Sequence, residues 1–238
     1  AHALPAASTL RRSRFRWRIV AFVALIAAIL AVAGRFATEN GLSGDQIARV
    51  VIDGTITTDA GRLAVLEALA KNDTVKAVVV AINSPGGTTA GGEELYDALT
   101  KLRAKKPVVA YIKEVGASAA YMTAIAADRI FARRLSITAS IGVLFKSYNA
   151  GKLLETIGIG SEKIASGPLK AEPDIDHPMS ADVRASIQSL VDDSFAWFVD
   201  IVAERRGLSR EATLALADGR IMTGNQAIAS KLVDEVGA

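Results

Sequence analysis

Residues 75–87 read VKAVVVAINSPGG, and this stretch decides the fold. Its first eight residues form a nearly continuous apolar run, which is typical of a β-strand buried on both faces of a parallel sheet. The Asn-Ser-Pro-Gly-Gly that follows ends the strand, and we expect a helix over residues 90–102. A strand of this kind followed by a helix indicates an α/β protein.

The alternation of strand and helix continues on both sides of this stretch. We expect further strands at 47–53, 107–112, 129–132 and 140–143, and further helices at 59–72 and 118–127. This order implies right-handed crossovers and a mainly parallel sheet. From about residue 181 the pattern changes to helices, which we expect at 181–206, 209–217 and 223–231.

The composition excludes several kinds of active site. The chain has 238 residues and no cysteine, so disulfides, cysteine nucleophiles and thiolate metal sites are all ruled out. Of its two histidines, His2 precedes a long apolar segment, which leaves His177 as the one imidazole of the body. His177 lies beside Pro178 in a polar stretch, where we expect a solvated loop residue rather than a catalytic base. We therefore predict no metal and no organic cofactor.

The net charge of +3 belongs to the N-terminus. Six of the 28 basic residues are arginines within residues 1–38, a segment that contains no acidic residue. The remaining 22 basic residues face 25 acidic ones, so the body is weakly acidic. A nucleic-acid-binding face needs clustered Lys and Arg on the folded domain, and we predict no such partner.

Residues 19–34 (IVAFVALIAAILAVAG) carry no polar side chain. Sixteen helical residues span about 24 Å, and flanking arginines and aromatic residues can extend this toward the roughly 30 Å of a bilayer core. We therefore predict a basic cytoplasmic N-terminus at 1–18, a transmembrane signal anchor at 19–36 and a linker at 37–46, followed by a folded domain over 47–238.

Two other interpretations of the apolar segment stay open. It could be a cleaved signal peptide, because Ala31-Val32-Ala33 has the small-x-small form of a cleavage site. It could also be a buried helix of a soluble protein, although an arginine cluster beside an all-apolar helix is unusual there.

Two turns are candidates for chemistry. In residues 83–87 (NSPGG), two glycines after a buried strand allow backbone N–H groups to converge on an oxyanion. In residues 115–121 (VGASAAY), Ser118 would stand at the positive end of a helix, with the Ala119 N–H beside it. Taken singly, the first could be a simple turn and the second an ordinary N-cap serine.

Together the two turns are more specific, because adjacent parallel strands place both at the carboxyl edge of the sheet. The combination predicts an acyl-transfer site that lacks only its base. Nucleotide binding is unlikely, because neither turn has the lysine of a phosphate-binding loop or the spacing GxGxxG.

Four motifs resemble the signal peptide peptidase A family, whose members are membrane-bound serine peptidases with the Clp-protease/crotonase fold. The motifs are INSPGG (82–87), GASAAY (116–121), SITASIGV (136–143) and SGPLK (166–170). They occur in the order and spacing of the family, and the resemblance extends from about residue 47 to the late MTGNQAIASKLVDEVG (222–237). It implies a Clp/crotonase-like spiral domain of α/β class over 47–238, with a mainly parallel sheet, C-terminal helices and one N-terminal transmembrane helix.

The resemblance also implies the catalytic residues. Ser118 is then the nucleophile and Lys170 the general base, Gly87 and Ala119 supply the oxyanion-hole N–H groups, and Ser140 orients the lysine. A free lysine has a pKa near ~10.4, and burial in an apolar pocket can lower a lysine pKa by several units. The implied reaction is hydrolysis of signal peptides or other short unstructured peptides through an acyl-enzyme.

The chain departs from the family at two places. The family shows S-G-G-Y where this chain has SAAY (118–121), and T-G-S where it has TAS (138–140). An added Cβ could narrow the site or disfavour a residue that needs a positive φ.

The family further implies a homo-oligomeric ring on the bacterial cytoplasmic membrane, with the catalytic domain on the extracytoplasmic (periplasmic) side. In its short members, Ser and Lys can come from neighbouring protomers. Two alternatives remain: a catalytically weak membrane scaffold that binds peptides in the same cleft, and a crotonase-type acyl-CoA enzyme, which shares the oxyanion hole but has no use for a Ser–Lys pair.

Overall fold

The computed structural model describes residues 17–18, 20–32 and 44–237, in two compact units that divide after Asp45. In the first unit, residues 17–18 and 20–32 are helical. No helix of the described residues combines the length and the apolarity needed to cross a bilayer. The anchor expected at 19–36 includes residue 19 and residues 33–36, which lie outside the described part of the chain.

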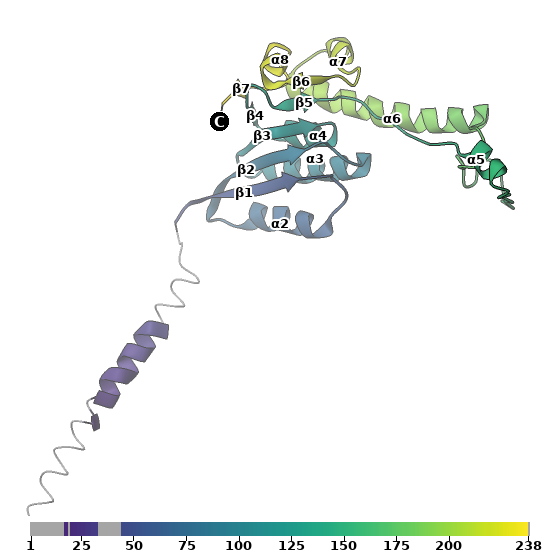
Figure 1. Cartoon of the computed structure of the whole chain (residues 1–238). Coiled ribbons are helices and arrows are strands. Elements are labelled where there is room, and N and C mark those ends of the chain that lie inside the picture. Colours follow the sequence, from purple (N-terminus) through teal and green to yellow (C-terminus); the bar gives the residue numbers. More distant parts are fainter. Residues whose placement is uncertain (1–16, 19, 33–43, 238) are drawn as a thin grey trace, which may run out of the picture. The chain divides into compact units, whose positions relative to one another are not determined.

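The second unit is built on a sheet, with α2, α3 and α4 all on one of its faces (Figure 1). Its strands are β1 (Gln46–Asp53), β2 (Val75–Ser84), β3 (Val108–Ala117), β4 (Arg129–Ala132), β5 (Ile137–Ala139), β6 (Ile221–Thr223) and β7 (Glu235–Val236). Five of them run in the order β1-β2-β3-β4-β7 with parallel pairing, and β6 pairs antiparallel with β5, so the sheet is mainly parallel, as expected. The long strand β3 pairs with β4 through its first half and with β5 through its last three residues.

The helices of this unit are α2 (Ala60–Lys71), α3 (Thr89–Arg103), α4 (Ala119–Ile125), α5 (Gly151–Thr156), α6 (Ala181–Arg206), α7 (Arg210–Leu216) and α8 (Gly224–Ala229). Polar side chains fix several of their N-termini, because the first backbone N–H groups of a helix have no acceptor within it. Thr88 accepts from the Gly91 N–H at the start of α3, and Ser180 accepts from the Val183 N–H at the start of α6.

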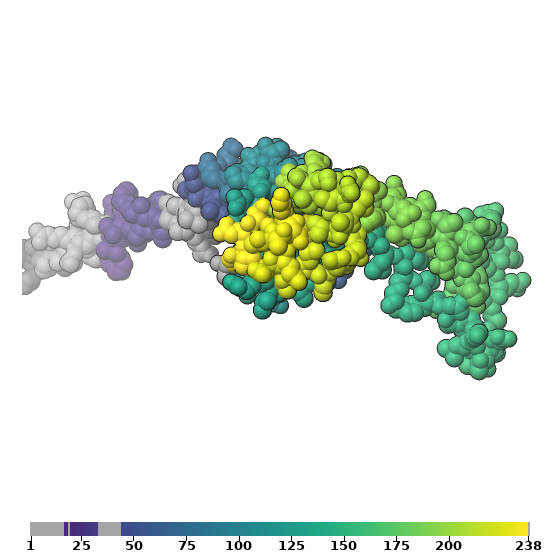
Figure 2. Space-filling model, turned by 90° about the horizontal axis from the view of Figure 1, so that it is seen from above, coloured from purple at the N-terminus to yellow at the C-terminus, as the bar shows by residue number. Residues whose placement is uncertain are grey.

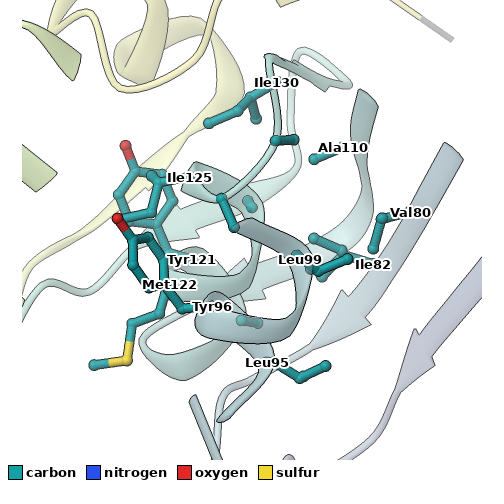
Figure 3. Close-up of a cluster of buried hydrophobic side chains, with 14 of the residues drawn as sticks. Val80, Ile82, Leu95, Tyr96, Leu99, Ala110, Tyr121, Met122, Ile125 and Ile130 are labelled. Carbon is teal, nitrogen blue, oxygen red and sulfur yellow. The ribbon is translucent and has the colours of Figure 1, made fainter. Parts of the chain in front are cut away.

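The core lies between the sheet and α3 and α4 (Figure 3). Val80 and Ile82 of β2 are fully buried, as are Leu95 and Leu99 of α3. Full burial of such a side chain contributes about 1.5–3 kcal/mol. The two helices approach closely at Gly92, where an added Cβ would lie 2.6 Å from the Met122 sulfur. This close contact allows the alanine-rich α4 to sit deep in the core.

Hydrogen bonds from α6 and to the C-terminal segment fix the position of α4. The buried Tyr121 hydroxyl donates to the Leu232 carbonyl at 2.8 Å, and burial raises the pKa of Tyr121. Arg205 of α6 donates from Nε to the Ile125 carbonyl and from Nη2 to the Ala127 carbonyl, both at 2.8 Å. These bonds satisfy carbonyls at the end of α4 that no helical N–H can reach.

Residues 141–180 leave the sheet and form an arm, which runs along α6 to α5 at its outer end (Figures 1 and 2). The strand expected at 140–143 is wrong, because β5 ends at Ala139. Ala139 and Ser140 have φ of 66° and 52°, values that turn the chain out of the extended conformation. Apolar side chains stay exposed along the arm: Leu144 is 82% and Ile164 95% accessible.

Replacing Tyr121 by Phe tests the link between α4 and the C-terminal segment. We expect Tyr121→Phe to lower the free energy of unfolding by about 1–3 kcal/mol, because the Leu232 carbonyl loses its buried donor. Urea denaturation of the purified protein measures this. Ser186→Ala, at an exposed position of α6, is the control and should change stability by less than about 0.5 kcal/mol. Equal effects of the two substitutions would contradict the assignment.

Candidate active site

Ser118 stands at the turn from β3 into α4, in a backbone conformation that a serine rarely adopts. Its φ is 56° and its ψ is −124°, and its side chain makes no capping hydrogen bond to the helix. Its N–H donates to the Ala139 carbonyl at 2.9 Å, and its own carbonyl accepts from the Tyr121 and Met122 N–H groups. The interpretation as an ordinary N-cap serine is therefore wrong, and the hydroxyl is available for chemistry.

The glycine turn after β2 lies directly against this serine. An added Cβ at Gly86, which has a φ of 108°, would lie 2.8 Å from the Ser118 Cβ and 3.1 Å from the Ala119 nitrogen. Ser84 of β2 also pairs with Gly116 of β3 in the parallel register. The two turns are therefore side by side at the carboxyl edge of the sheet, as the sequence predicted.

Gly87 is held by a parallel bridge to Ile56. The Ile56 N–H donates to the Gly86 carbonyl and the Thr88 N–H donates to the Ile56 carbonyl, both at 2.9 Å. A Cβ at Gly87 would come within 1.8 Å of the Ile56 oxygen, so only glycine fits.

The backbone N–H groups of Gly87 and Ala119 have no backbone acceptor in this arrangement of the described residues. In a parallel bridge, the N–H of the bridged Gly87 is directed away from Ile56, and the Ala119 N–H belongs to the first turn of α4, where no helical acceptor exists. Within the described part of the chain, neither amide donates to a backbone carbonyl outside these elements. Two unused donors beside a hydroxyl are the elements of an oxyanion hole.

Ser140 lies next to the same turn. Its N–H donates to the Arg220 carbonyl at 2.9 Å, and the preceding Ala139 carries the carbonyl that holds the Ser118 N–H. Thr138 donates from Oγ1 to the Gly116 carbonyl at 2.9 Å, which fixes β5 against β3. Residues 138–140 (TAS) therefore hold the Ser118 turn through these hydrogen bonds. Ala139 has the left-handed backbone conformation at a position where the related family has glycine.

These residues open into a cleft of about 900 Å³. Its walls come from both turns, from the segment after Ser140, from the outer part of α6 and from residues 217–219. The lining is largely apolar, and it includes Met122, Val143, Leu144, Phe145, Leu190, Val191 and Phe195. Asp192 and Asp218 are its charged members, and the Arg220 guanidinium beside Asp218 lowers the pKa of that carboxyl to about 2.

Lys170 and His177 lie outside the cleft. Lys170 is an exposed residue of the arm, where its N–H donates to the Gly167 carbonyl at 3.1 Å. His177 contacts Asp176 and Glu172, and its hydrogen bond to Asp176 raises the pKa of the imidazole. A single chain thus brings Ser118, Gly87, Ala119 and Ser140 together but leaves out the lysine.

The sequence did not reveal two walls of the cleft. Residues 188–195 of α6 and residues 217–219 face Ser118 from far along the chain. The apolar stripe of 181–206 was visible in the sequence, but a stripe does not say which part packs on the core and which part lines a cleft. In the structure Phe198 and Val202 are fully buried, whereas Leu190 is 60% exposed.

The fold and the site together define a class: a serine hydrolase on a Clp-protease-like scaffold. A ClpP1 mutant from Listeria monocytogenes superimposes with a TM-score of 0.51, covering 79% of this chain and 90% of that chain at 16% identity. This likeness shows the fold. The sequence model of Clp protease also matches residues 46–152.

The family is narrower than the class. The sequence model of peptidase family S49 matches residues 100–238, and the chain belongs to this family of serine peptidases. A putative protease of Synechocystis is 39% identical over 81% of this chain and 70% of its own length. A putative protease of Methanocaldococcus jannaschii is 34% identical, covering 92% and 76%, and a putative signal peptide peptidase of Enterococcus faecium is 32% identical, covering 84% and 62%.

Ala139 provides a test of backbone strain beside the site. We expect Ala139→Gly to raise the free energy of unfolding by about 1 kcal/mol, because a Cβ at positive φ costs about 1–2 kcal/mol, partly offset by the freedom of glycine in the unfolded chain. Urea denaturation measures the change. Ala110→Gly, in the middle of β3, is the control and should destabilise the protein. Destabilisation by both would show that Ala139 is not strained.

Proposed function

We propose that this peptidase uses a Ser118–Lys170 dyad to hydrolyse signal peptides or other short unstructured peptides at a membrane. The observation that carries the proposal is the Ser118 hydroxyl at the start of α4, which makes no capping hydrogen bond and lies beside the amides of Gly87 and Ala119. A hydroxyl with two adjacent donors can form and stabilise a tetrahedral intermediate, which is the difficult step of acyl transfer.

The steps follow from these positions. A neutral Lys170 amine takes the proton of the Ser118 hydroxyl while Oγ attacks the scissile carbonyl carbon. The Gly87 and Ala119 N–H groups donate to the resulting oxyanion, and each such donor is worth about 3 kcal/mol in other hydrolases. The lysine then gives its proton to the leaving amine as the scissile C–N bond breaks. Water, deprotonated by the same lysine, attacks the acyl carbon, and the lysine returns that proton to Oγ as the ester C–Oγ bond breaks. Ser140, which also lines the cleft, orients the amine.

The lysine comes from a neighbouring copy of the chain in a homo-oligomeric ring. The arm that carries Lys170 extends beyond the rest of the domain (Figure 2). It exposes the apolar side chains Leu144, Tyr148, Ile164 and Leu169, which are 45–95% accessible. Exposed apolar surface of this extent is typical of a region covered by a partner. A second copy that covers the arm would bury these side chains and bring Lys170 into the largely apolar cleft. Desolvation there favours the neutral amine, against the opposite effect of the Asp192 and Asp218 carboxylates.

The substrate and the location follow from the cleft and the N-terminus. The apolar lining around Met122 and Phe195 favours peptides with small or apolar side chains, as signal peptides have. The relative from Enterococcus faecium is named a putative signal peptide peptidase. Residues 19–36 anchor the chain in the bacterial cytoplasmic membrane, and the preceding arginines keep the N-terminus in the cytoplasm, so the domain lies on the periplasmic side.

Covalent labelling with a fluorophosphonate tests the dyad in the purified full chain. We expect Ser118→Ala to abolish labelling, and Lys170→Met to slow it at least about a thousandfold, because a nucleophile without its base loses most of its reactivity. Ser186→Ala and Lys152→Met, at exposed positions, are the controls and should label at the wild-type rate. Full labelling of Lys170→Met would refute the dyad, and no labelling of the wild type would favour a peptide-binding scaffold.

A mixing experiment tests whether two copies share the site. Ser118→Ala and Lys170→Met chains, each inactive alone, are co-expressed with different tags and isolated as hybrids. If each site takes its serine and its lysine from different copies, about a quarter of the sites in an evenly mixed ring are complete. Labelling should then recover to about that fraction of wild type. Hybrids that form but stay unlabelled would place both residues in one copy.

A further inference from the structure

Two carboxylates follow Lys170 closely in the sequence, and each could disable it as a base. Glu172 and Asp174 are two and four residues away. A carboxylate paired with a lysine favours the ammonium form, which cannot accept the proton of a serine hydroxyl. The position of these two acids is therefore decisive for the proposed mechanism.

In the structure both carboxylates form ion pairs with another lysine, Lys163. Lys163 contacts Glu172 through Nζ and Oε1, and the same Nζ lies 3.5 Å from Oδ2 of Asp174. The Glu172 side chain is only 7% exposed, whereas Lys163 and Asp174 keep about 30% of their surface. One ammonium thus pairs with both acids inside the arm, and its single charge offsets one of their two.

The remaining bonds of Glu172 strengthen this arrangement. Its Oε1 lies 3.3 Å from His177 Nε2, and its Oε2 accepts the Asp174 N–H at 3.1 Å. His177 in turn contacts Asp176. Both oxygens of Glu172 are therefore occupied. Among the ion pairs of the described residues, none involves Lys170.

The backbone around Lys170 is fixed at the same time. The Lys170 N–H donates to the Gly167 carbonyl at 3.1 Å, and the Glu172 N–H donates to the Leu169 carbonyl at 3.4 Å. Ala171, between the two donor residues Lys170 and Glu172, has a φ of 64°. The anchored Glu172 side chain and these two turns hold the segment that carries the lysine.

We propose that Lys163 is a positioning residue that holds the carboxylates of Glu172 and Asp174 and so leaves the Lys170 amine unpaired in its own chain. This inference rests on the proposed function, in which Lys170 enters a neighbouring cleft as a neutral base. The hydrogen bond between Lys163 and Glu172 raises the pKa of Lys163 and lowers that of Glu172, so both partners stay charged at neutral pH.

Removing the Lys163 charge gives a distinct signature. Without it, two carboxylates beside Lys170 lose their counter-ion and favour the Lys170 ammonium. Two charges about 8 Å apart in a partly solvated setting interact by about 1 kcal/mol, which corresponds to roughly half to one pH unit. Asp192 and Asp218, the carboxylates of the cleft, are the same in variant and wild type. The acid limb of the pH–rate profile, where the labelling rate rises with pH, should shift to higher pH by that amount. The plateau rate at high pH should stay the same.

The experiment measures the fluorophosphonate labelling rate of the full-chain oligomer between about pH 6 and 10. A lysine base whose pKa is lowered by burial changes its protonation state within about this range. We expect Lys163→Met to label about threefold to tenfold more slowly on the acid limb. Lys163→Arg should keep the wild-type profile. Adding Glu172→Gln to Lys163→Met should move the limb back toward wild type, because it removes one uncompensated charge. Lys152→Met, which removes a charge from α5 of the same arm, should leave the limb in place.

The outcomes separate this inference from the proposed function. A Lys163→Met rate that falls equally at every pH, or a limb that does not move, would show a structural role and overturn the inference, provided that oligomer size and thermal midpoint match wild type. Labelling that survives Lys170→Met would instead remove the dyad itself. A limb that moves with Lys163→Met and returns with the double variant supports the inference.

Discussion

The structure depends on one constraint: β2 and β3 must lie next to each other, parallel and in register, with almost no space between the turns that follow them. Ser84 pairs with Gly116, and the Gly86 α-carbon leaves no room for a side chain against Ser118. The apolar run of β2, fully buried at Val78, Val80 and Ile82, provides the driving force for this arrangement. Because the carboxyl ends of parallel strands share one edge, the Ser118 hydroxyl and the amides of Gly87 and Ala119 come together there.

Backbone strain is concentrated at the same place. Ser118, Ala139 and Ser140 all have positive φ, and the Ser118 N–H to Ala139 carbonyl bond joins the first two. Such conformations persist only where the surrounding structure holds them. Here the support comes from β5 against β3, from the Tyr121 bond to Leu232 and from Arg205 at the end of α4. The C-terminal elements therefore help to hold the Ser118 turn in its conformation, although they lie far from Ser118 in the sequence.

The arm is stabilised by different interactions from those of the core. It contributes little to the core of its own chain, and it exposes apolar residues such as Ile164. Its internal order comes from charges: Lys163, Glu172, Asp174, Asp176 and His177 form one connected group. Charge-assisted hydrogen bonds of this kind can order a loop that does not pack on a hydrophobic core. Under the proposed function, the body supplies a serine held by packing, and the arm supplies a lysine whose surroundings are set by electrostatics.

The sequence by itself determined the α/β class, the strand and helix order up to β4, the long α6 and the two turns around Gly87 and Ser118. These features follow from local periodicity and turn chemistry, which any window of the chain displays. Only the tertiary structure decided that β5 ends at Ala139, that α6 and residues 217–219 wall the cleft, and that Lys163 takes the acids beside Lys170. These features depend on contacts between distant segments, and a single sequence carries no signal for such contacts. Turn chemistry predicted Ser118 as a candidate nucleophile, whereas Lys170 was implied by the resemblance alone, because a lysine in an irregular segment has no local pattern that marks it as a base.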